Sequence, residues 1–305
     1  MSPTAHNGDR HVVFVGVDSR SSRALTAVPR WSRRLGEPLA LRPVDLPLAA
    51  NRERYLRIFD GLQTDPNIAG AVITEHKVAM YEAIAGRCTY VSPDARRLRE
   101  CAVLAARPSG VAAFATDVRA IGAEVDRIWP SSRAPVVCLG GGGAAAALCL
   151  QLLRRRPAPD RILVCEHDRA RGRELGMLFT RETLPHGVKL HVEVGAMEWD
   201  DAVVSLPPGA LVVNATGLGK TDRSSPLSPA AVFPERVTVW DLNYRGPLPF
   251  LAQAHAQAQL CSLNVHDGWH LFALGWLAAL SALLDVDVTT DIEESFVAIA
   301  EEVGR

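Results

Sequence analysis

The sequence of 305 residues predicts an α/β protein with two domains, and three observations lead to this prediction. Short apolar runs of strand length alternate with stretches of helical periodicity along most of the chain. A glycine-rich turn at residues 140–145 follows one of these runs and precedes a helical stretch. Residues 269–284 are apolar on nearly every side of a helix, so that helix must be buried. Together these features predict two domains, each with its own core.

The first alternating series predicts strands at residues 11–18, 39–46 and 69–74. A helix is expected after Lys77, and another from Asp117 to Trp129. The second series predicts strand cores at Val136–Leu139, Ile162–Cys165, Leu190–Val194, Ala210–Asn214 and Val237–Leu242.

Helices at 269–284 and 291–303 close the chain, and we expect them to return to the N-terminal domain. The predicted domains are therefore residues 1–118 with 268–305, and residues 119–267.

The glycine-rich turn predicts a dinucleotide site of the Rossmann type. Gly140 and Gly142, with Ala145 in the third position, match G-x-G-x-x-A. The first glycine makes the tight turn, the second lets a pyrophosphate approach the backbone, and the first amides of the helix attract an anion. The alternative is a close-packed structural turn. The expected cofactor contacts here are Gly140, Gly141, Gly142, Gly143, Ala144 and Ala145.

The next apolar strand ends at Glu166, His167 and Asp168, all three expected beside the cofactor. A carboxylate at this strand end accepts both ribose hydroxyls and repels a 2′-phosphate, so Glu166 favours NAD over NADP, with Asp168 as the second choice. Two alternatives stay open. In the first, Glu166 or Asp168 only caps the following helix. In the second, Arg169 or Arg171 binds the 2′-phosphate of NADP.

Lys77 lies where a strand gives way to a helix, the end of an open sheet at which α/β proteins present their chemistry. A cation in the first turn of a helix is mildly unfavourable against the helix dipole, so its presence needs a reason; the alternative is a solvated lysine. Asp117 also opens a helix, where its alternative role is a cap.

Five segments together resemble the shikimate and quinate dehydrogenase family in order and spacing: G-x-x-x-T-x-H-K at 70–77, A-T-D at 115–117, G-x-G-G-A at 140–144, N-A-T-G at 214–217 and D-L-N-Y at 241–244. The resemblance implies that Lys77 and Asp117 are the catalytic pair on the substrate domain, and that residues 119–267 bind NAD. Oxidation of a secondary alcohol removes the hydroxyl proton as hydride leaves. A lysine of lowered pKa beside a carboxylate can relay that proton.

The resemblance also implies further site residues. Ser19, Ser21 and Ser22 match the segment that grips the substrate carboxylate, although they would equally cap a helix near Arg23. Tyr244 would line the substrate side, or else be a half-buried core tyrosine. The other expected contacts are Thr74, Trp269 and His270 with the substrate, and Asn214, Ala215, Thr216 and Gly268 with the cofactor.

Three departures from the family pattern concern the substrate. Ala115, Val103 or Leu104, and Gly275 stand where the family has two asparagines and a glutamine that bond substrate hydroxyls. A site built to hydrogen-bond hydroxyls discriminates strongly, so their loss predicts a substrate other than shikimate, one with fewer hydroxyls or more aromatic character.

Composition limits the partners. A net charge of -1 gives no excess field for nucleic acid or an anionic membrane, and neither is expected. Six scattered cysteines fit a reducing cytosol, and no histidine spacing indicates a metal. We expect a cytoplasmic NAD(P)-dependent oxidoreductase with a small-molecule substrate, and we consider a homodimer. The alternatives are a shikimate or quinate dehydrogenase proper, or a nucleotide-binding regulatory or biosynthetic protein without redox chemistry.

Overall fold

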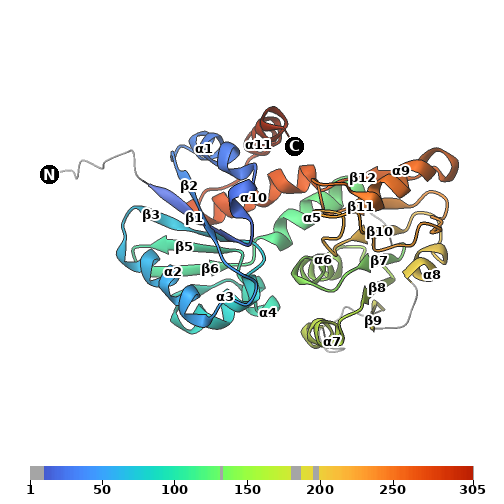
Figure 1. Cartoon of the computed structure of the whole chain (residues 1–305), viewed down its shortest axis with the longest axis horizontal. Helices are drawn as coiled ribbons and strands as arrows, with labels where there is room; N and C mark the ends of the chain where they lie inside the picture. Colours follow the sequence, from blue (N-terminus) through green and yellow to red (C-terminus); the bar gives the residue numbers. More distant parts are fainter. Residues whose placement is uncertain (1–9, 131–132, 180–186, 195–198, 305) are drawn as a thin grey trace. The chain divides into compact units, whose positions relative to one another are not determined.

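The structure, a computed structural model, describes residues 10–130, 133–179, 187–194 and 199–304. The chain divides into two compact units, Met1–Ala120 with Ala273–Arg305, and Ile121–Phe272 (Figure 1). The sequence predicts divisions after residues 118 and 267. The chain enters the second unit within helix α5, Asp117–Ile128, and leaves it within helix α10, Trp269–Leu284.

The first unit contains a mixed sheet with the strand order β2-β1-β3-β5-β6-β4. The strands β1 to β3 are parallel, β5 runs antiparallel to both of its neighbours, and β4 is parallel to β6. The strands are β1 His11–Gly16, β2 Ala40–Asp45, β3 Ile68–Ile73, β4 Tyr90–Val91, β5 Val103–Arg107 and β6 Gly110–Phe114. The helices are η1 Ser19–Ser21, α1 Ala24–Arg34, α2 Arg52–Thr64, α3 Lys77–Ile84, η2 Ala85–Arg87, α4 Pro93–Leu98 and α11 Thr290–Val303.

Each face of this sheet has its own core. On one face, Tyr55 and Phe59 of α2 and Met80 of α3 pack with alternate residues of the strands. On the other, Trp31 of α1 stacks on Phe296 of α11, with ring centroids 5.2 Å apart. Residues 273–305 thus belong to the N-terminal unit, which confirms the predicted return of the C-terminal helices.

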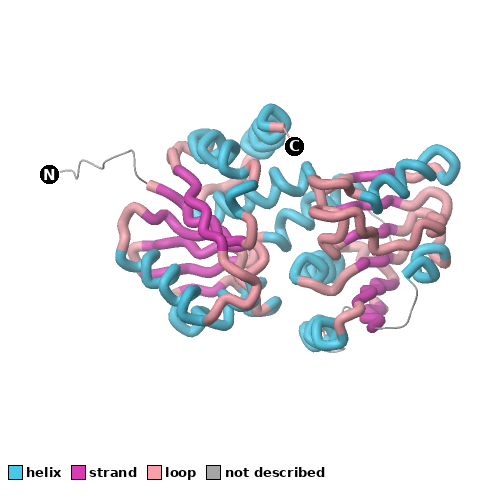
Figure 2. Tube along the Cα trace, viewed as in Figure 1, coloured by secondary structure: helices cyan, strands magenta, loops and turns pink. Residues whose placement is uncertain are grey.

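The second unit contains a parallel sheet with the strand order β12-β11-β10-β7-β8-β9, the Rossmann arrangement that the sequence predicts (Figure 2). Its strands are β7 Val136–Leu139, β8 Arg161–Glu166, β9 Lys189–Val194, β10 Leu211–Asn214, β11 Thr238–Asp241 and β12 Asn264–His266. Its remaining helices are α6 Gly143–Arg154, α7 Arg169–Leu178, α8 Trp199–Val204 and α9 Pro249–Cys261.

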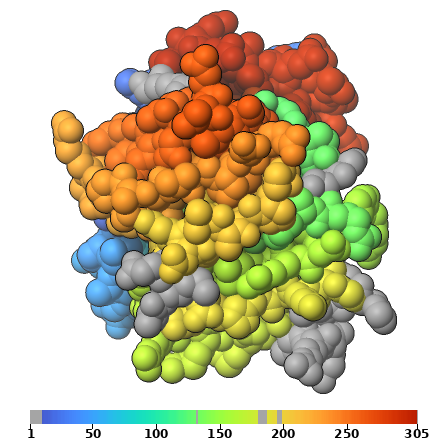
Figure 3. All heavy atoms as spheres, turned by 90° about the vertical axis from the view of Figure 1, so that its right-hand side faces the viewer, coloured from blue at the N-terminus to red at the C-terminus, as the bar shows by residue number. Residues whose placement is uncertain are grey.

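The central strands of this sheet are buried along their whole length, because helices cover both faces. Helices α8 and α9 contribute Trp199, Val203 and Phe250 to the core on one face. Figure 3 looks onto this unit and shows the α9 region in orange at the surface. Among the described residues, no helix has the length and apolar character needed to cross a membrane.

Candidate functional site

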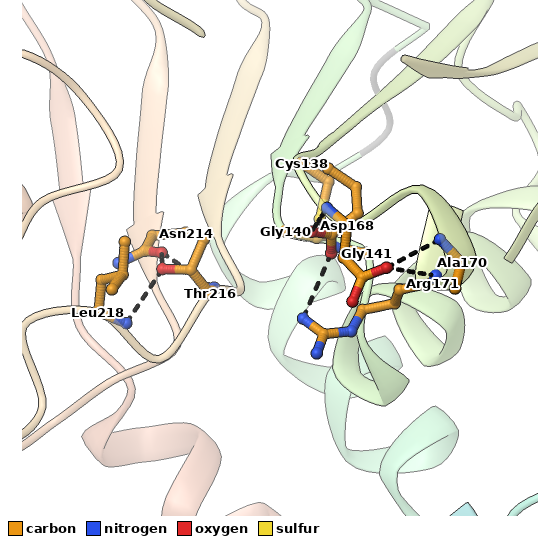
Figure 4. Close-up of polar contacts among 10 residues, drawn as sticks. Cys138, Gly140, Gly141, Asp168, Ala170, Arg171, Asn214, Thr216 and Leu218 are labelled. Carbon is orange, nitrogen blue, oxygen red and sulfur yellow. Dashed lines mark hydrogen bonds and ion pairs between the residues drawn. The ribbon is translucent and has the colours of Figure 1, made fainter. Parts of the chain in front are cut away.

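The glycine-rich turn is built of backbone that excludes larger residues. Gly140 follows β7 with φ of +100°, and a Cβ placed on it would lie 3.0 Å from the Thr216 amide nitrogen. The turns after β7 and β10 therefore pack directly on each other, at the point where the strand order of the sheet reverses (Figure 4). Ligands of doubly wound sheets bind in the crevice at this point.

Helix α6 begins at Gly143, so Gly143, Ala144 and Ala145 form its first turn. Gly142 is the residue that precedes this turn, and no side chain caps it in the described structure. Nothing lies within 4 Å of a Cβ placed on Gly142. Half-buried first-turn amides without a capping side chain, in open space, suit the pyrophosphate of a dinucleotide.

Glu166 lies at the end of β8 against this turn and is 5% exposed. Its Oε2 accepts a hydrogen bond from the Gly141 amide at 2.8 Å, and its Oε1 accepts one from the Asp168 amide at 2.9 Å. Asp168 caps α7, accepting hydrogen bonds from the Ala170 and Arg171 amides. Asp168 therefore caps α7, as one of the alternatives predicts, whereas the Glu166 carboxylate binds the glycine-rich turn. Arg171 brings a guanidinium nitrogen to 3.6 Å from Glu166.

A buried polar network holds the turns after β10 and β11. Asn214 donates from Nδ2 to Asp241 Oδ1 at 3.1 Å, and its own Oδ1 accepts from the Thr216 hydroxyl at 2.7 Å. Asp241 Oδ2 has no hydrogen-bond partner among the described residues, and burial raises the pKa of this carboxyl to about 6. Ala215 is held to β7, because its amide donates to the Leu139 carbonyl. This network fixes the loop that the sequence assigns to the cofactor.

Gly268 is required by packing, since a Cβ there would lie 2.0 Å from the Leu242 carbonyl oxygen. His167 is exposed and stacks on Trp199, with ring centroids 4.2 Å apart and planes 7° from parallel. The sequence did not single out Trp199, which is separated from Glu166 in the chain by helix α7 and strand β9. Nothing in the sequence around Trp199 indicates that its ring stacks on His167, a residue that follows β8.

In the first unit, Lys77 and Asp117 form an ion pair between Nζ and Oδ2. Lys77 is the first residue of α3 and Asp117 the first of α5, and their side chains are 19% and 25% exposed. Two sequence segments 40 residues apart are thus brought together as the resemblance implies. Asp117 uses its carboxylate on Lys77, where the alternative had it serve as a helix cap.

The expected lowered pKa of Lys77 is wrong. Burial does lower this pKa, but the negative charges of Asp117, Glu100 and Glu75 and the hydrogen bond from Lys77 to Asp117 outweigh burial, and the pKa of Lys77 is raised. Around Lys77 the attraction of the close carboxylates exceeds the cost of dehydrating the ammonium. Lys77 is therefore an ammonium group in this state of the protein.

Glu100 is a part of this cluster that the sequence patterns did not reveal. It is 2% exposed, and its Oε1 has no hydrogen-bond partner among the described residues. Burial raises the pKa of the Glu100 carboxyl to about 7; the charge of Lys77 lowers this pKa and that of Asp117 raises it. Glu100 follows the arginine-rich helix α4, where a glutamate resembles an ordinary solvated charge, so the sequence carried no signal of its burial.

The three predicted substrate serines lie around η1 and differ in their surroundings. Ser19 is buried and donates to Asp45 Oδ1 from both its amide, at 2.7 Å, and its hydroxyl, at 2.5 Å. Ser21 donates to the Asp18 carboxylate, and the Ser22 hydroxyl accepts from the Ala24 amide at the start of α1. The Ser22 hydroxyl thus binds an amide of the first turn of α1, as the helix-capping alternative predicts.

The other predicted substrate residues are divided between the two units. Thr74, at the end of β3, donates from its hydroxyl to the Val15 carbonyl at 3.1 Å. In the second unit, Tyr244 packs on Trp269 and Phe272, with ring centroids 5.3 and 4.9 Å away. The Nδ1 atom of His270 lies 2.5 Å from Oε2 of Glu124, which has no exposed surface. His270 thus has one ring nitrogen already engaged.

Of the residues at the positions where the sequence departs from the family pattern, Val103, Leu104 and Ala115 are apolar and buried, whereas Gly275 is half-buried. Leu104 and Ala115 belong to one core cluster, while Val103 points to the opposite face of β5. Leu104 is therefore the residue that shares a face with Ala115. Nothing lies within 4 Å of a Cβ placed on Gly275 in α10, so this position has room for a side chain.

The structure is thus a two-unit α/β protein with a Rossmann-type sheet, a glycine-rich turn where its strand order reverses, and a lysine–aspartate ion pair. Comparison with solved structures gives this fold as that of shikimate dehydrogenase-like proteins. The shikimate 5-dehydrogenase of Thermus thermophilus, in complex with shikimate, has a TM-score of 0.70 at 22% identity, over 97% of this chain and 100% of that chain. The low identity makes this chain a divergent example of the fold.

Two further solved structures show the same likeness. The quinate dehydrogenase of Corynebacterium glutamicum, in complex with NAD, has a TM-score of 0.74 at 18% identity, over 95% of this chain and 99% of that one. The ligand-free 5-ketofructose reductase of a Gluconobacter species has a TM-score of 0.71 at 16% identity, over 97% and 100%. No family model matches the chain, and no curated protein matches it.

Proposed function

We propose that the protein is an NAD(P)-dependent oxidoreductase that interconverts a cyclic secondary alcohol and its ketone. The observation that carries this proposal is the ion pair between Lys77 and Asp117 in a chain of the shikimate dehydrogenase-like fold. Such a pair moves a proton to or from a substrate oxygen. The bound nicotinamide supplies the hydride that the protein itself lacks.

The residue composition supports a special role for Lys77. The chain has 33 lysines and arginines, of which only Lys77, Lys189 and Lys220 are lysines. One of these three occupies the first turn of a helix, where a cation opposes the helix dipole, and it is half-buried against carboxyl groups. A surface charge has no need of this arrangement. A proton-transfer group does, because it must be held within reach of a substrate oxygen.

The residues of the second unit fit a dinucleotide. The α6 amides and Gly142 would receive the pyrophosphate, and Glu166 would accept the ribose hydroxyls with the lone pairs that Gly141 and Asp168 leave free. Asn214, Ala215 and Thr216 would lie beneath the cofactor. His167, stacked on Trp199, offers a flat surface beside the ribose end.

We propose NAD as the preferred cofactor, because Glu166 would repel a 2′-phosphate. Arg171 opposes this preference, since its guanidinium lies within 4 Å of the same carboxylate and carries the charge that a phosphate would use. The buried and doubly hydrogen-bonded Glu166 is fixed in place, whereas the Arg171 side chain is 55% exposed. The fixed charge therefore sets the preference.

We propose that the substrate differs from shikimate. Leu104, Ala115 and Gly275 supply no hydrogen bond to ring hydroxyls, and Leu104 and Ala115 are part of the apolar core. A ketone with fewer hydroxyls enters a site without these amides at lower cost, since no substrate hydroxyl is left unpaired. The 5-ketofructose reductase among the similar structures is an example of the fold acting on another carbonyl compound.

A panel of cyclic ketones and alcohols, each assayed with NAD and NADP in both oxidation states by nicotinamide absorbance, tests the proposal. We expect turnover of at least one compound, with loss of turnover in Lys77→Ala and unchanged NAD binding. A protein that binds NAD and turns over none of them would instead fit the regulatory alternative.

A further inference from the structure

The cluster around Lys77 contains one more carboxyl group than proton transfer by a lysine–aspartate pair requires. We propose that Glu100 is a positioning residue for Lys77, the second carboxyl of a three-member cluster that holds the Lys77 ammonium in place for proton exchange with a substrate oxygen. This inference rests on the proposed function and adds to it a third ionisable group that acts on the reacting proton.

The burial of Glu100 is the first observation. The residue is 2% exposed, and Oε1 has neither solvent contact nor a hydrogen-bond partner among the described residues. A buried carboxylate oxygen without a partner is costly, so the group stays either protonated or close to a positive charge. Lys77 is the positive charge that acts on it.

The backbone fixes Glu100 and Lys77 relative to each other. The Cys101 amide, adjacent to Glu100, donates to the Lys77 carbonyl at 3.2 Å, and the Glu100 amide donates to the Ala95 carbonyl at 3.3 Å. The residue after Glu100 is thus hydrogen-bonded to the first residue of α3, and Glu100 itself is bound to the end of α4. This connection keeps the backbone of Glu100 beside that of Lys77, and burial limits the positions open to the Glu100 carboxyl.

The charges around the cluster come from several elements. Asp117 from α5, Glu100 from the segment after α4 and Glu75 from the turn before α3 all act on Lys77, and all three favour its charged form. Two thiols lie near the cluster, Cys101 and Cys88, and the pKa of each is raised by burial, so both are neutral at pH 7. Besides the two carboxyls of the cluster, the charge of Glu75 acts on the same ammonium, and among the described residues no second cation is one of the groups that act on it.

An excess of negative charge has a chemical consequence. A lysine of raised pKa keeps its proton to higher pH, so the cluster extends the pH range over which Lys77 carries the proton that a carbonyl oxygen takes up. In the reverse reaction the same nitrogen takes that proton back, because a catalyst accelerates a reaction and its reverse alike.

The atoms and electrons of the reduction balance. A bound reduced nicotinamide would supply hydride, a hydrogen with its electron pair, to the carbonyl carbon as the carbon–oxygen π bond breaks. The oxygen takes a proton from Lys77 Nζ, giving the alcohol, the oxidised nicotinamide and a neutral lysine. Lys77 then regains a proton from water, which reaches it because its side chain is 19% exposed. Asp117 and Glu100 make this uptake favourable.

The test uses the full-length protein labelled with ¹³C-lysine. Three lysines give three sets of side-chain NMR signals, and Lys189 and Lys220 serve as internal references. In the wild type we expect the Lys77 signal to shift near pH 7, as Glu100 titrates beside it. In Glu100→Gln that inflection disappears and the pKa of Lys77 falls. Glu82→Gln, a change of the same charge on α3, leaves both features unchanged.

The second measurement is the pH profile of kcat/KM for ketone reduction. We expect the alkaline limb, where Lys77 loses its proton, to move to lower pH in Glu100→Gln, whereas a merely structural defect would lower the whole profile without moving it. A wild-type Lys77 signal with no inflection near pH 7 overturns the proposal, even if the variant does not fold. An inflection in a protein that reduces no ketone instead overturns the proposed function and leaves the coupling of Glu100 to Lys77 standing.

Discussion

The proposed cofactor cradle of the second unit and the proposed proton-transfer cluster of the first rely on different chemical groups. The cradle uses backbone amides, glycines and one carboxylate fixed by two amides. The cluster uses side-chain charges, Lys77 against Asp117 and Glu100, in a unit whose residues Leu104 and Ala115 are apolar. Backbone donors survive most substitutions, because every residue except proline carries an amide N–H. A side-chain site changes its substrate when a few residues change.

The largest effect expected from this comparison is on turnover. Lys77→Ala removes the proton donor and should lower kcat by about a thousandfold, within the range of general acid catalysis. Asp117→Asn leaves the lysine but removes its partner, and should cost roughly a hundredfold. NAD affinity, measured by calorimetry, should stay within about twofold for both, since the cradle belongs to the other unit.

Lys189→Ala is the matched control, because Lys189 is an exposed lysine at the start of β9. It should leave both kcat and NAD affinity unchanged. Near-normal kcat in Lys77→Ala would mean that the ion pair is structural.

The next effect concerns the substrate. Shikimate and quinate should have kcat/KM lower by roughly a thousandfold than the best ketone or alcohol of a cyclic panel, because three hydroxyl contacts are missing. Gly275→Gln restores one amide at a position with room for it, and should raise kcat/KM for shikimate about tenfold. If the wild type oxidises shikimate efficiently, other residues have replaced the missing amides.

A smaller effect is expected in the cradle. NAD should bind about tenfold to a hundredfold more tightly than NADP, since Glu166 faces the 2′ position in the proposed complex. Glu166→Gln should narrow this ratio by improving NADP binding, and Arg171→Ala should widen it. Fluorescence titration of the reduced cofactors measures both. If the wild type binds NADP more tightly than NAD, Arg171 and not Glu166 determines the cofactor preference.

The smallest effect is on stability. The pKa of Glu100 is raised from 4.5 to about 7, so the folded protein binds a proton that the unfolded chain releases. Its contribution to the free energy of unfolding is full below pH 4.5 and is lost as the pH rises towards 7, in all on the order of 1–3 kcal/mol. Glu100→Gln has no carboxyl to titrate at this position, so its free energy of unfolding does not fall for this reason as the pH rises. Urea unfolding of both proteins at pH 5 and pH 8 measures the difference, which should favour the variant more at pH 8; an equal difference at both pH values would contradict the raised pKa.

Sequence patterns sufficed where local chemistry decides the structure. The strand, glycine turn and helix at 136–154 follow from apolar runs and backbone conformation, and the parallel Rossmann sheet follows from their repetition. The antiparallel pair β5 and β6 was not predicted, because its alanine-rich strands carry little β propensity and their pairing depends on β3.

The candidate site divides in the same way. Motif residues such as Lys77, Asp117 and Gly140 were found from their spacing, and the structure brings the first two together. Glu100, Trp199 and Glu124 were not found, because their burial depends on neighbours distant in the sequence. The wrong direction for the pKa of Lys77 has the same cause, since it required knowing that a second carboxyl lies nearby.

The most direct test of the proposed function is transfer of deuterium from NADH labelled at C4. The wild-type protein is incubated with the labelled cofactor and a panel of cyclic ketones, and the products are analysed by mass spectrometry and NMR. We predict that deuterium from one face of the nicotinamide appears at the new carbinol carbon of at least one product, and that Lys77→Ala gives about a thousandfold slower transfer. Full retention of deuterium on bound NADH with every ketone would contradict the assignment of Lys77 and Asp117 to hydride-transfer chemistry.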